Sequence, residues 1–391
     1  MPDGQAGGDA AHRAAPGRGG GSPPRRDVAV TGMGVMSAFG RGTGPLLRHV
    51  SRGTHAFADV TRFDVTGCRV RSAAHAPGSP ELAGELVAVV EDACADAAIG
   101  PGERAGCPLL LAAHAEPAVT GAAGGAGLAA VVAQRCGLRA GPRIYTAACV
   151  AASTAVADAA AMIASGSLDR AVVAAGYLVE PGNFALFHAG RALARDGRIR
   201  PFSAGRQGTL LGDGVAAVVL APARAARGRG AGVLATVAGW GRTGDAYHVC
   251  QPRPDGAGLA RAVDSALRRA GAAPAEVGYI NANGTGTPQS DAAEAAGLRR
   301  AFGDLAGGVP VSSTKSVHGH ALEASALVEL VVTVLAMRSG TLPVNAGFLG
   351  ADADCELDLV LGEPRPAQPR YALSVNFAFG GANTALLVGA G

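Results

Sequence analysis

Short apolar runs alternate along this chain with longer stretches rich in alanine. Runs of about four to eight apolar residues bounded by glycine or polar residues are typical of strands. Residues 27–31 form the first such run, and Gly32 and Gly34 are expected to close it. The alanine-rich stretch 150–165 predicts a helix that stops at Gly166. Because this helix is small and apolar on nearly every side, we expect it to be buried.

The other strand candidates fall into two series, separated by a basic linker at residues 224–229. Strands that alternate with helices predict an α/β fold in which helices cover layered sheets. Short runs of alanine and valine stay ambiguous between strand and helix. The further strands are predicted at 108–112, 170–175 and 214–220 in the first series, and at 232–238, 277–281, 309–312, 372–377 and 384–388 in the second.

The two series have similar ends. A glycine-rich turn precedes the last strand of each, at Leu211-Gly-Asp-Gly214 in the first and at Phe379-Gly-Gly-Ala-Asn383 in the second. These matching ends indicate an internal duplication. We therefore expect one half at residues 27–223 and a second half at 224–391.

Composition narrows the class of protein. The chain has 391 residues, 48% of them apolar, which is enough for a substantial core. Its net charge of +3 is too small to indicate binding to nucleic acid. Seven cysteines without CxxC spacing indicate a reducing compartment and no disulfide framework. The sequence contains no cluster typical of metal ligands, so we expect no metal.

The N-terminal segment carries no targeting signal that we recognise. Residues 1–26 are rich in Gly, Pro, Ala and Arg and have no apolar stretch of the kind found in secretory signals. Such a composition predicts a disordered leader. No apolar run is long enough to span a membrane, so a cytoplasmic protein without membrane contact is expected.

One cysteine lies where a predicted strand meets the buried helix, in Tyr145-Thr-Ala-Ala-Cys-Val-Ala-Ala-Ser153. There Cys149 would face the positive end of the helix dipole, and free N–H groups at that end would lower its pKa. A thiolate can accept an acyl group from a thioester. The alternative is an inert cysteine packed in an apolar helix, as free cysteines commonly are.

Three later segments bear on this choice. The first is Asn281-Ala-Asn-Gly-Thr-Gly-Thr-Pro288, followed by Asp291 and Glu294. The second is Ser312-Ser-Thr-Lys-Ser-Val-His-Gly-His320, and the third is Ala378-Phe-Gly-Gly-Ala-Asn383. In this order, after a cysteine between strand and helix, they resemble the β-ketoacyl-acyl-carrier-protein synthases, the ketosynthases of fatty acid and polyketide synthesis in the thiolase superfamily.

The resemblance runs from about residue 27 to the C-terminus and implies a thiolase fold, in which two similar α/β halves form five αβαβα layers. It also implies a dimer, either of two identical chains or with another ketosynthase-like chain. The implied substrates are acyl groups carried on the phosphopantetheine of an acyl carrier protein or on coenzyme A. No bound cofactor is implied.

The same resemblance implies roles for the residues of the matching motifs. Cys149 would be the acylated nucleophile and His320 a catalytic histidine, and Lys315 and Glu294 would form a buried ion pair behind them. Thr285 and Thr287 would face the extender unit, and Phe379 would act as a gate. The backbone N–H groups of Cys149 and Phe379 would form an oxyanion hole. Phe187 and His188 would lie beside the acyl pocket. For His188 we weigh a packing role first.

The sequence also departs from the family pattern. Asn283 stands where decarboxylating ketosynthases have a histidine, and an amide can donate a hydrogen bond but cannot titrate. His318 and Glu323 flank His320 at positions where the family has small or polar residues. Two interpretations of His318 stay open, a site residue and a solvated loop residue. Glu323 is expected to pair with His318 or to contact a polar acyl chain. The stretches 71–92 and 113–145 are short, and family members use the first of them for dimer contacts and for lining the acyl channel.

Three functions are compatible with these observations. The chain could transfer an acyl group from Cys149 to an acceptor other than a decarboxylated malonyl unit. It could be a condensing enzyme in which Asn283 and His320 stabilise the enolate. It could instead be a non-catalytic partner similar to chain-length factors, but such partners usually lack the cysteine that this chain retains.

Overall fold

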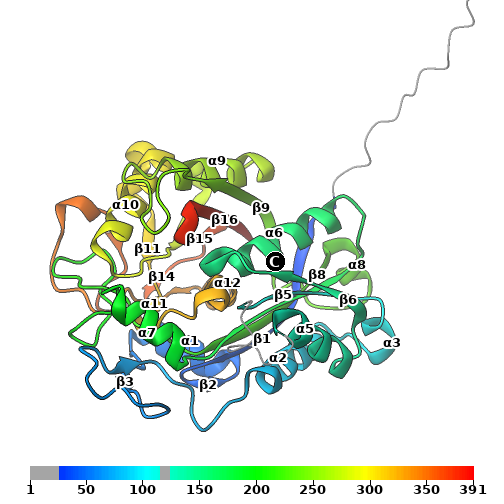
Figure 1. Ribbon diagram of the computed structural model, residues 1–391. Helices are drawn as coiled ribbons and strands as arrows, with labels where there is room; N and C mark the ends of the chain where they lie inside the picture. Colours follow the sequence, from blue (N-terminus) through cyan, green and yellow to red (C-terminus); the bar gives the residue numbers. More distant parts are fainter. Residues whose placement is uncertain (1–25, 115–123) are drawn as a thin grey trace, which may run out of the picture.

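The computed structural model describes residues 26–114 and 124–391 (Figure 1). The predicted leader therefore lies, except for Arg26, outside the described residues. Within them, twelve strands form one mixed sheet with the order β13-β11-β10-β15-β16-β9-β1-β8-β7-β5-β6, and β2 pairs with β1 beside this path. The main strands are β1 (Val28–Ser37), β5 (Pro108–Ala112), β6 (Arg139–Tyr145), β7 (Ala171–Tyr177), β8 (Gly214–Pro222), β9 (Ala235–Gly244), β10 (Val277–Asn281), β11 (Pro310–Ser312), β15 (Tyr371–Phe377) and β16 (Ala382–Ala390).

The sheet consists of two halves with the same topology. In the first half β6, β5 and β7 are parallel neighbours, followed by antiparallel β8 and β1. In the second half β11, β10 and β15 are parallel neighbours, followed by antiparallel β16 and β9. The halves meet through a short antiparallel pairing of β1 with β9. The two similar α/β halves expected from the sequence are thus present.

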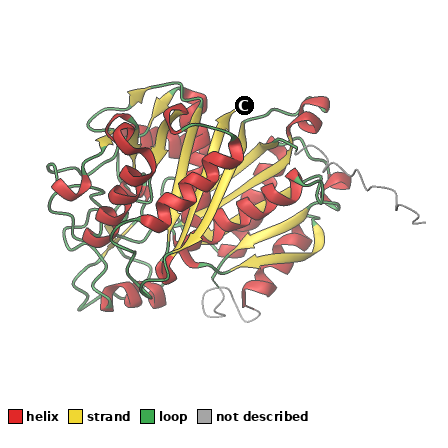
Figure 2. Ribbon diagram, turned by 90° about the horizontal axis from the view of Figure 1, so that it is seen from above, coloured by secondary structure: helices red, strands yellow, loops and turns green. Residues whose placement is uncertain are grey.

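Helices and the two halves of the sheet form five layers: outer helices, one half, the central helices, the other half, and outer helices again (Figure 2). The central pair, α6 (Ala151–Ala164) and α12 (Ser325–Ser339), contacts strands of both halves. On one outer face α2 (Leu82–Asp96) and α5 (Gly124–Arg135) cover the first half, and on the other α9 (Ala257–Ala270) and α10 (Pro288–Phe302) cover the second. The other α-helices of the described residues are α1 (Thr43–Arg52), α3 (Pro101–Arg104), α7 (Pro181–Ala189), α8 (Ala223–Gly228) and α11 (Lys315–His318). The short strands are β2 (Gly40–Arg41), β3 (Ala58–Asp59), β4 (Ser72–Ala73), β12 (Thr341–Leu342), β13 (Asp358–Leu359) and β14 (Arg365–Pro366).

Glycines allow the outer helices to approach the sheet. A Cβ on Gly34 of β1 would lie 2.1 Å from the carbonyl oxygen of Val89 in α2. In the second half, a Cβ on Gly241 of β9 would lie 1.8 Å from the carbonyl oxygen of Ala262 in α9. No side chain fits at either distance, so the same device holds one outer helix against each half.

One predicted strand boundary is wrong, and the difference has a physical reason. The first strand does not end at Gly32 but continues as β1 to Ser37, because Gly32 and Gly34 serve the approach of α2 rather than a turn. The basic linker at 224–229 is largely helical, as α8, with Ala223 and Ala226 buried beneath its exposed arginines. The strands predicted at 108–112 and 277–281 are confirmed.

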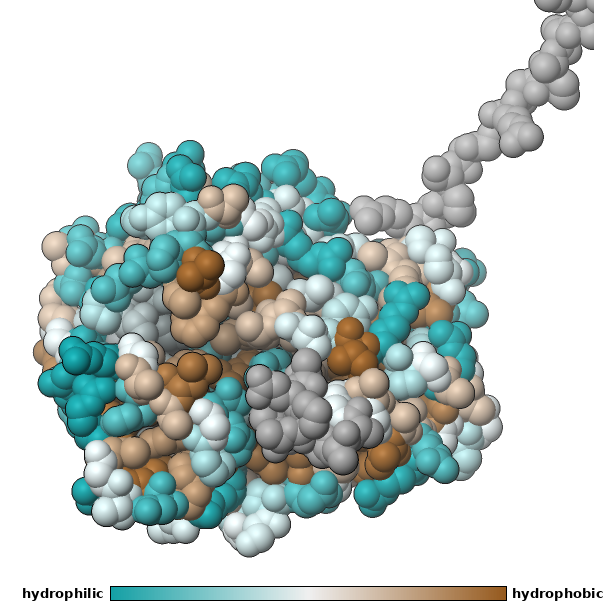
Figure 3. Space-filling view, viewed as in Figure 1, coloured by the Kyte–Doolittle hydropathy of each residue, from teal (hydrophilic) through white to brown (hydrophobic). Residues whose placement is uncertain are grey.

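The surface is mixed in character. Figure 3 shows hydrophobic residues in separate patches on a face that is otherwise largely polar. Large apolar side chains with more than half of their surface exposed include Leu186, Val249 and Phe379. Among the described helices, none has both the length and the apolar character that crossing a membrane requires.

Candidate active site

Cys149 lies in a tight turn between strand β6 and the central helix α6. The turn is the 3₁₀ segment η1 (Ala148–Val150), and it begins with Ala148 at a φ of +47°, a conformation that costs energy for a residue with a Cβ. The strained turn leads directly into α6 and leaves the cysteine half-buried. The predicted position of Cys149, after a strand and before a buried helix, is confirmed.

His320 is the direct partner of this cysteine. Its Nε2 atom lies 3.1 Å from the Cys149 Sγ, and its Nδ1 atom lies 2.8 Å from the Oγ of Ser325. The backbone of His320 is fixed as well, because its N–H donates to Leu210 and its carbonyl accepts from Gly212. The glycine-rich turn before β8 therefore positions the histidine.

Burial determines the protonation of this pair. It raises the pKa of the Cys149 thiol to about 12, and the carboxylate of Glu323 adds to the increase. The pKa of His320 falls well below its usual value, through burial and then through the positive charge of Lys315. The expectation of a lowered cysteine pKa is thus wrong, since the cost of desolvating a thiolate exceeds the help from the helix end. The resting pair is a neutral thiol beside a neutral imidazole.

Lys315 is buried behind this pair and forms an ion pair, but not with the predicted residue. Its Nζ lies 2.5 Å from Oε1 of Glu329 in α12, and it also donates to Oδ1 of Asn283 at 3.1 Å. The second carboxylate oxygen of Glu329 accepts from the amide of Asn376 at 2.6 Å. The predicted pairing of Lys315 with Glu294 is therefore corrected to a pairing with Glu329.

Glu294 instead supports the loop that carries Asn283. Its two carboxylate oxygens accept from the backbone N–H groups of Asn283 and Gly284, both at 2.7 Å. Asp291, one turn earlier in α10, accepts from the N–H groups of Gly286 and Phe202. Burial raises the pKa of Glu294 to about 8, although the two N–H donors oppose this rise.

The orientation of the Asn283 amide follows from Lys315. An ammonium can only donate, so the amide must turn its oxygen toward Nζ. The amide nitrogen Nδ2 then faces away from the lysine, is buried, and has no hydrogen-bond partner among the described residues. Asn283 thus keeps an unused, buried N–H donor, and the residue itself lines the same cavity as Cys149.

A cavity of about 380 Å³ opens above these residues. Thr285 and Thr287 lie on one wall with their hydroxyl oxygens 3.2 Å apart. Phe187 and Phe379 lie on another, with stacked rings whose centroids are 6.1 Å apart. The structure therefore brings together, around one cavity, Cys149, His320, Asn283, Thr285, Thr287, Phe187 and Phe379.

Besides Lys315 and Glu294, three predicted residues do not line this cavity. His188 accepts from the backbone N–H of Arg69 at 2.8 Å, which agrees with a packing role. His318 is buried, with Nδ1 2.9 Å from the carbonyl of Gly319 and Nε2 3.1 Å from Oγ1 of Thr314. The solvated alternative for His318 is therefore wrong. Because both of its ring nitrogens make these contacts, His318 is not the hydrogen-bond partner of Glu323, which is also buried.

Sequence reasoning missed Ser325 and Glu329. Glu329 interrupts an apolar run of α12, and a carboxylate in such a helix needs a buried partner. That pattern was a usable signal for a buried cation. Ser325, in contrast, resembles many helix-initiating serines, and only the three-dimensional structure places its hydroxyl beside His320.

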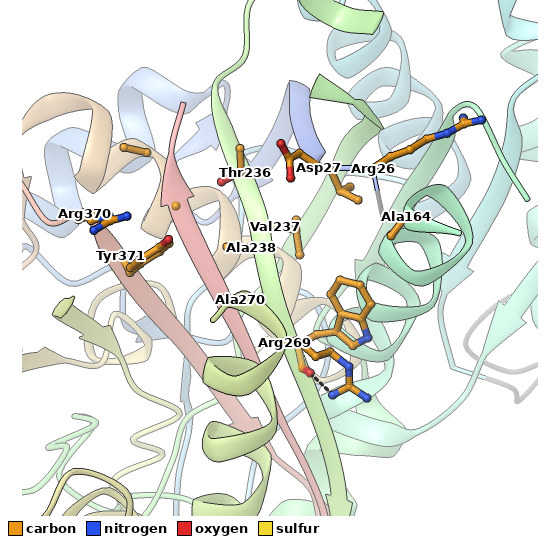
Figure 4. Close-up of a pocket in the computed structure, with 14 residues that line it drawn as sticks. Arg26, Asp27, Ala164, Thr236, Val237, Ala238, Arg269, Ala270, Arg370 and Tyr371 are labelled. Carbon is orange, nitrogen blue, oxygen red and sulfur yellow. Dashed lines mark hydrogen bonds between the residues drawn. The ribbon is translucent and has the colours of Figure 1, made fainter. Parts of the chain in front are cut away.

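A second hollow, of about 490 Å³, lies at the far end of the central helix (Figure 4). Ala164, the last residue of α6, lines this hollow, whereas Cys149 lies just before the first residue of the same helix. The 14-residue helix separates them by about 21 Å at 1.5 Å per residue. Arg269 here donates to the carbonyl of Trp240 at 2.6 Å. With neither cysteine nor histidine on its wall, this hollow has no counterpart of the Cys149–His320 pair in the first cavity.

Comparisons with known proteins agree with this site. The chain matches the family descriptions "Beta-ketoacyl synthase, N-terminal domain" at residues 97–226 and "Beta-ketoacyl synthase, C-terminal domain" at residues 234–349. It is 38% identical over 255 residues to 3-oxoacyl-[acyl-carrier-protein] synthase 2 of Coxiella burnetii. This alignment covers 63% of this chain and 62% of that protein. The chain thus aligns with about three fifths of the length of that relative.

Another relative aligns over nearly its whole length. It is named "Putative polyketide beta-ketoacyl synthase 1", comes from Streptomyces cyaneus, and is 32% identical over 93% of this chain and 98% of its own. Among solved structures, the ishigamide ketosynthase/chain length factor superposes with a TM-score of 0.86 at 28% identity, covering 94% of this chain and 100% of that one. A β-ketoacyl synthase from Burkholderia phymatum superposes with a TM-score of 0.83 at 26% identity, covering the same shares of both chains. The chain belongs to the β-ketoacyl synthase family and has the thiolase fold of that family.

Proposed function

We propose that this protein is an acyltransferase that forms an acyl thioester on Cys149 and passes the acyl group on. The observation that carries the proposal is the contact of 3.1 Å between Cys149 Sγ and His320 Nε2 in a cavity open to substrate. A thiol beside a neutral imidazole is the arrangement needed for nucleophilic attack on a thioester. A non-catalytic partner would have no use for this pair.

In the first half-reaction the Cys149 thiol attacks the carbonyl carbon of an incoming acyl thioester. His320 Nε2 takes the thiol proton as the S–C bond forms, since neither a thiolate nor an imidazolium is stable here beforehand. The oxyanion accepts hydrogen bonds from the backbone N–H groups of Cys149 and Phe379. When the tetrahedral intermediate collapses, the carrier thiol leaves with the proton returned by His320.

In the second half-reaction Asn283 acts as a hydrogen-bond donor. Condensation with a malonyl-type thioester breaks a C–C bond, releases carbon dioxide and leaves an enolate. The enolate oxygen needs donors rather than a titrating group, and Nδ2 of Asn283 is oriented for this by Lys315. The enolate carbon then attacks the acyl carbonyl, and the Cys149 thiolate leaves and takes up a proton. The second candidate is transfer to another thiol, alcohol or amine, in which the enolate does not form.

The substrates would arrive on the phosphopantetheine of an acyl carrier protein or on coenzyme A. Several relatives carry an acyl carrier protein in their names. The cavity mouth offers the exposed side chains of Arg191 and Phe379. A cation suits the phosphate of the arm, and an apolar ring suits its hydrocarbon part.

We place a dimer contact on strand β6. This seven-residue strand lies at the edge of the sheet and, within the described part of the chain, pairs only with β5. Free backbone groups along an edge favour pairing with another strand. A second β6, related by a two-fold axis, would pair antiparallel and extend the sheet across both chains. Two arrangements fit this contact: a second copy of this chain, or a related chain of the kind named in the ketosynthase/chain length factor structure.

The test is intact-protein mass spectrometry with the full chain. Incubation with hexanoyl-pantetheine should add one hexanoyl group, and Cys149→Ala should abolish the addition. Malonyl-carrier protein is then added, and loss of the acyl mass is followed together with carbon dioxide. Stoichiometric carbon dioxide and a β-ketoacyl product support condensation, whereas discharge only to added thiol, alcohol or amine supports the second candidate.

The Asn283 role has its own control. Asn283→Ala should leave acylation of Cys149 within a few-fold of wild type but slow condensation by about 100-fold, as removal of one oxyanion donor does. Asn283→His, which offers an N–H at the same position, should restore part of the rate. If Cys149 never acquires the acyl mass, the proposed function is wrong.

A further inference from the structure

Thr209 lies on the wall of the cavity that Cys149 and His320 also line. Only 2% of its surface is exposed, and its hydroxyl has no hydrogen-bond partner among the described residues. The segment is extended, with strand-like bridges at Thr209 and Leu211, and Leu210 between them packs in the core. Successive side chains of an extended segment point to opposite faces, so Thr209 faces away from the side that Leu210 occupies. A buried hydroxyl without a partner costs free energy, which favours a substrate group that pairs with it.

The backbone around Thr209 is held on both sides. The N–H of Gly208 donates at 2.9 Å to the carbonyl of Gly286, which belongs to the loop with the threonine pair of the cavity. The carbonyl of Leu210 accepts from the N–H of His320 at 2.8 Å. Thr209 therefore lies between that loop and His320. A substrate in the cavity meets this residue in place, without the entropic cost of ordering a loop.

The other polar groups on the cavity wall leave one role open. Asn283 has an unused Nδ2, which the proposed mechanism assigns to the enolate oxygen. The hydroxyls of Thr285 and Thr287 lie 3.2 Å apart, within reach of each other. Among the described residues that line the cavity none is acidic, and the cationic side chain is that of Arg191 at the mouth. An anionic substrate group therefore meets no like charge here, and the Thr209 hydroxyl is a buried donor without a role.

We propose that Thr209 binds the carboxylate of the malonyl-type unit until that carboxylate leaves as carbon dioxide. Such a unit has two acceptors, the thioester oxygen and the carboxylate, on either side of one carbon. The proposed mechanism gives the first to Asn283, whereas the second still needs a donor. A hydroxyl can donate to a carboxylate, and hydrogen bonds to ionised groups are stronger than those between neutral ones. This inference rests on the condensing form of the proposed function and names the residue that recognises its second substrate.

The contact affects binding more than the chemical step. An acetyl unit lacks the carboxylate and leaves the hydroxyl unpaired, so a malonyl unit should bind at least about 10-fold tighter, as one hydrogen bond to an ionised group provides. When the C–C bond breaks, its electron pair stays on the enolate, and the carboxylate departs as neutral carbon dioxide. The contact therefore weakens along the reaction. Its removal should raise the KM for the malonyl unit without lowering kcat.

The binding experiment uses two pantetheine analogues in which an amide nitrogen replaces the thioester sulfur, one malonyl and one acetyl. Calorimetry with the full chain gives their affinities, and the wild type should prefer the malonyl analogue by at least about 10-fold. Thr209→Val removes the hydroxyl at nearly constant shape and should bring the two affinities within about 3-fold. Thr209→Ser keeps a hydroxyl and should keep most of the preference. Thr61→Val, a change at an exposed threonine outside the cavity, should keep all of it.

The kinetic experiment starts from hexanoyl-Cys149 and varies the concentration of malonyl-carrier protein. Carbon dioxide release and loss of the acyl mass give KM and kcat. Thr209→Val should raise KM by about 10-fold and leave kcat at or above the wild-type value. A fall in kcat at unchanged KM would mean that Thr209 contacts the enolate instead, and it would overturn the carboxylate contact.

The remaining outcomes separate this inference from the proposed function. Equal affinity of the wild type for both analogues overturns the contact. So does an equal loss of both affinities in Thr209→Val, which would show a structural role only. A preference that survives in Thr209→Val but disappears in Arg191→Gln assigns the carboxylate to the arginine and also overturns it. Analogue binding needs no acylation, whereas failure of wild-type Cys149 to take up hexanoyl defeats the proposed function itself.

Discussion

At the residue scale, the reactivity of Cys149 depends on its neighbours more than on its helix. The turn at Ala148 aims the thiol toward His320, and burial keeps both groups neutral. In the proposed acylation, the thiol proton therefore moves as the new S–C bond forms. A deprotonated cysteine at rest would react with any electrophile, whereas a neutral one reacts mainly when a bound thioester is in place.

This protonation state predicts the pH dependence of alkylation. The raised pKa makes the thiolate scarce at neutral pH. As long as the pH stays below that pKa, the thiolate fraction grows about tenfold for each unit by which the pH rises. Iodoacetamide labelling of Cys149 should thus rise by about tenfold per unit between pH 7 and pH 9. Labelling is measured by peptide mass, with the exposed Cys250 as internal reference. A plateau already reached near pH 7 would show a thiolate formed in advance and contradict this picture.

At the scale of elements, glycines set the distance between sheet and outer helices. Gly34 faces α2 and Gly241 faces α9, at equivalent places in the two halves. At each position any residue other than glycine would bring its Cβ into collision with a helix carbonyl oxygen. The repetition of this contact in both halves is a structural trace of their common topology.

A single added methyl group tests this contact. Gly34→Ala should lower the free energy of unfolding by about 1–3 kcal/mol, because α2 must move away or strain must be absorbed. Gly241→Ala should have an effect of the same size. Gly244→Ala is the control, since a Cβ there meets nothing within 4 Å, and it should stay within about 0.5 kcal/mol of wild type. Urea unfolding measures all three, and equal midpoints for Gly34→Ala and wild type would show that α2 has room to spare.

At the scale of the whole molecule, the site lies where the two halves meet. The first half supplies Cys149, the proposed nucleophile, and the second supplies His320 and Asn283. The central helices α6 and α12 contact each other and hold these parts in register. Neither half alone contains a complete site.

The edge strand β6 predicts the assembly of the molecule. Sedimentation velocity at micromolar concentration should give a species of twice the chain mass of 38.5 kDa if two copies of this chain pair. The backbone amides of β6 that do not face β5 should then exchange slowly with deuterium, and faster on dilution. A chain that remains monomeric and exchanges rapidly along β6 would contradict a dimer of identical chains and favour pairing with a related chain.

Much of the fold and the core of the site were determined by local sequence. The apolar runs at 108–112 and 277–281 become strands β5 and β10, and the turn before α6 carries the nucleophile. These features depend on residues close together in the chain, so pattern and motif are enough to find them. The motif residues Cys149 and His320 also come together as expected.

Only the tertiary structure decided which distant groups meet and how burial changes them. It pairs Lys315 with Glu329 instead of Glu294, buries His318, and raises the pKa of Cys149 rather than lowering it. Ion pairing and desolvation depend on three-dimensional packing between elements far apart in the chain. A one-dimensional pattern can propose a charged residue for the interior, but it cannot say which partner the folded chain will bring to it.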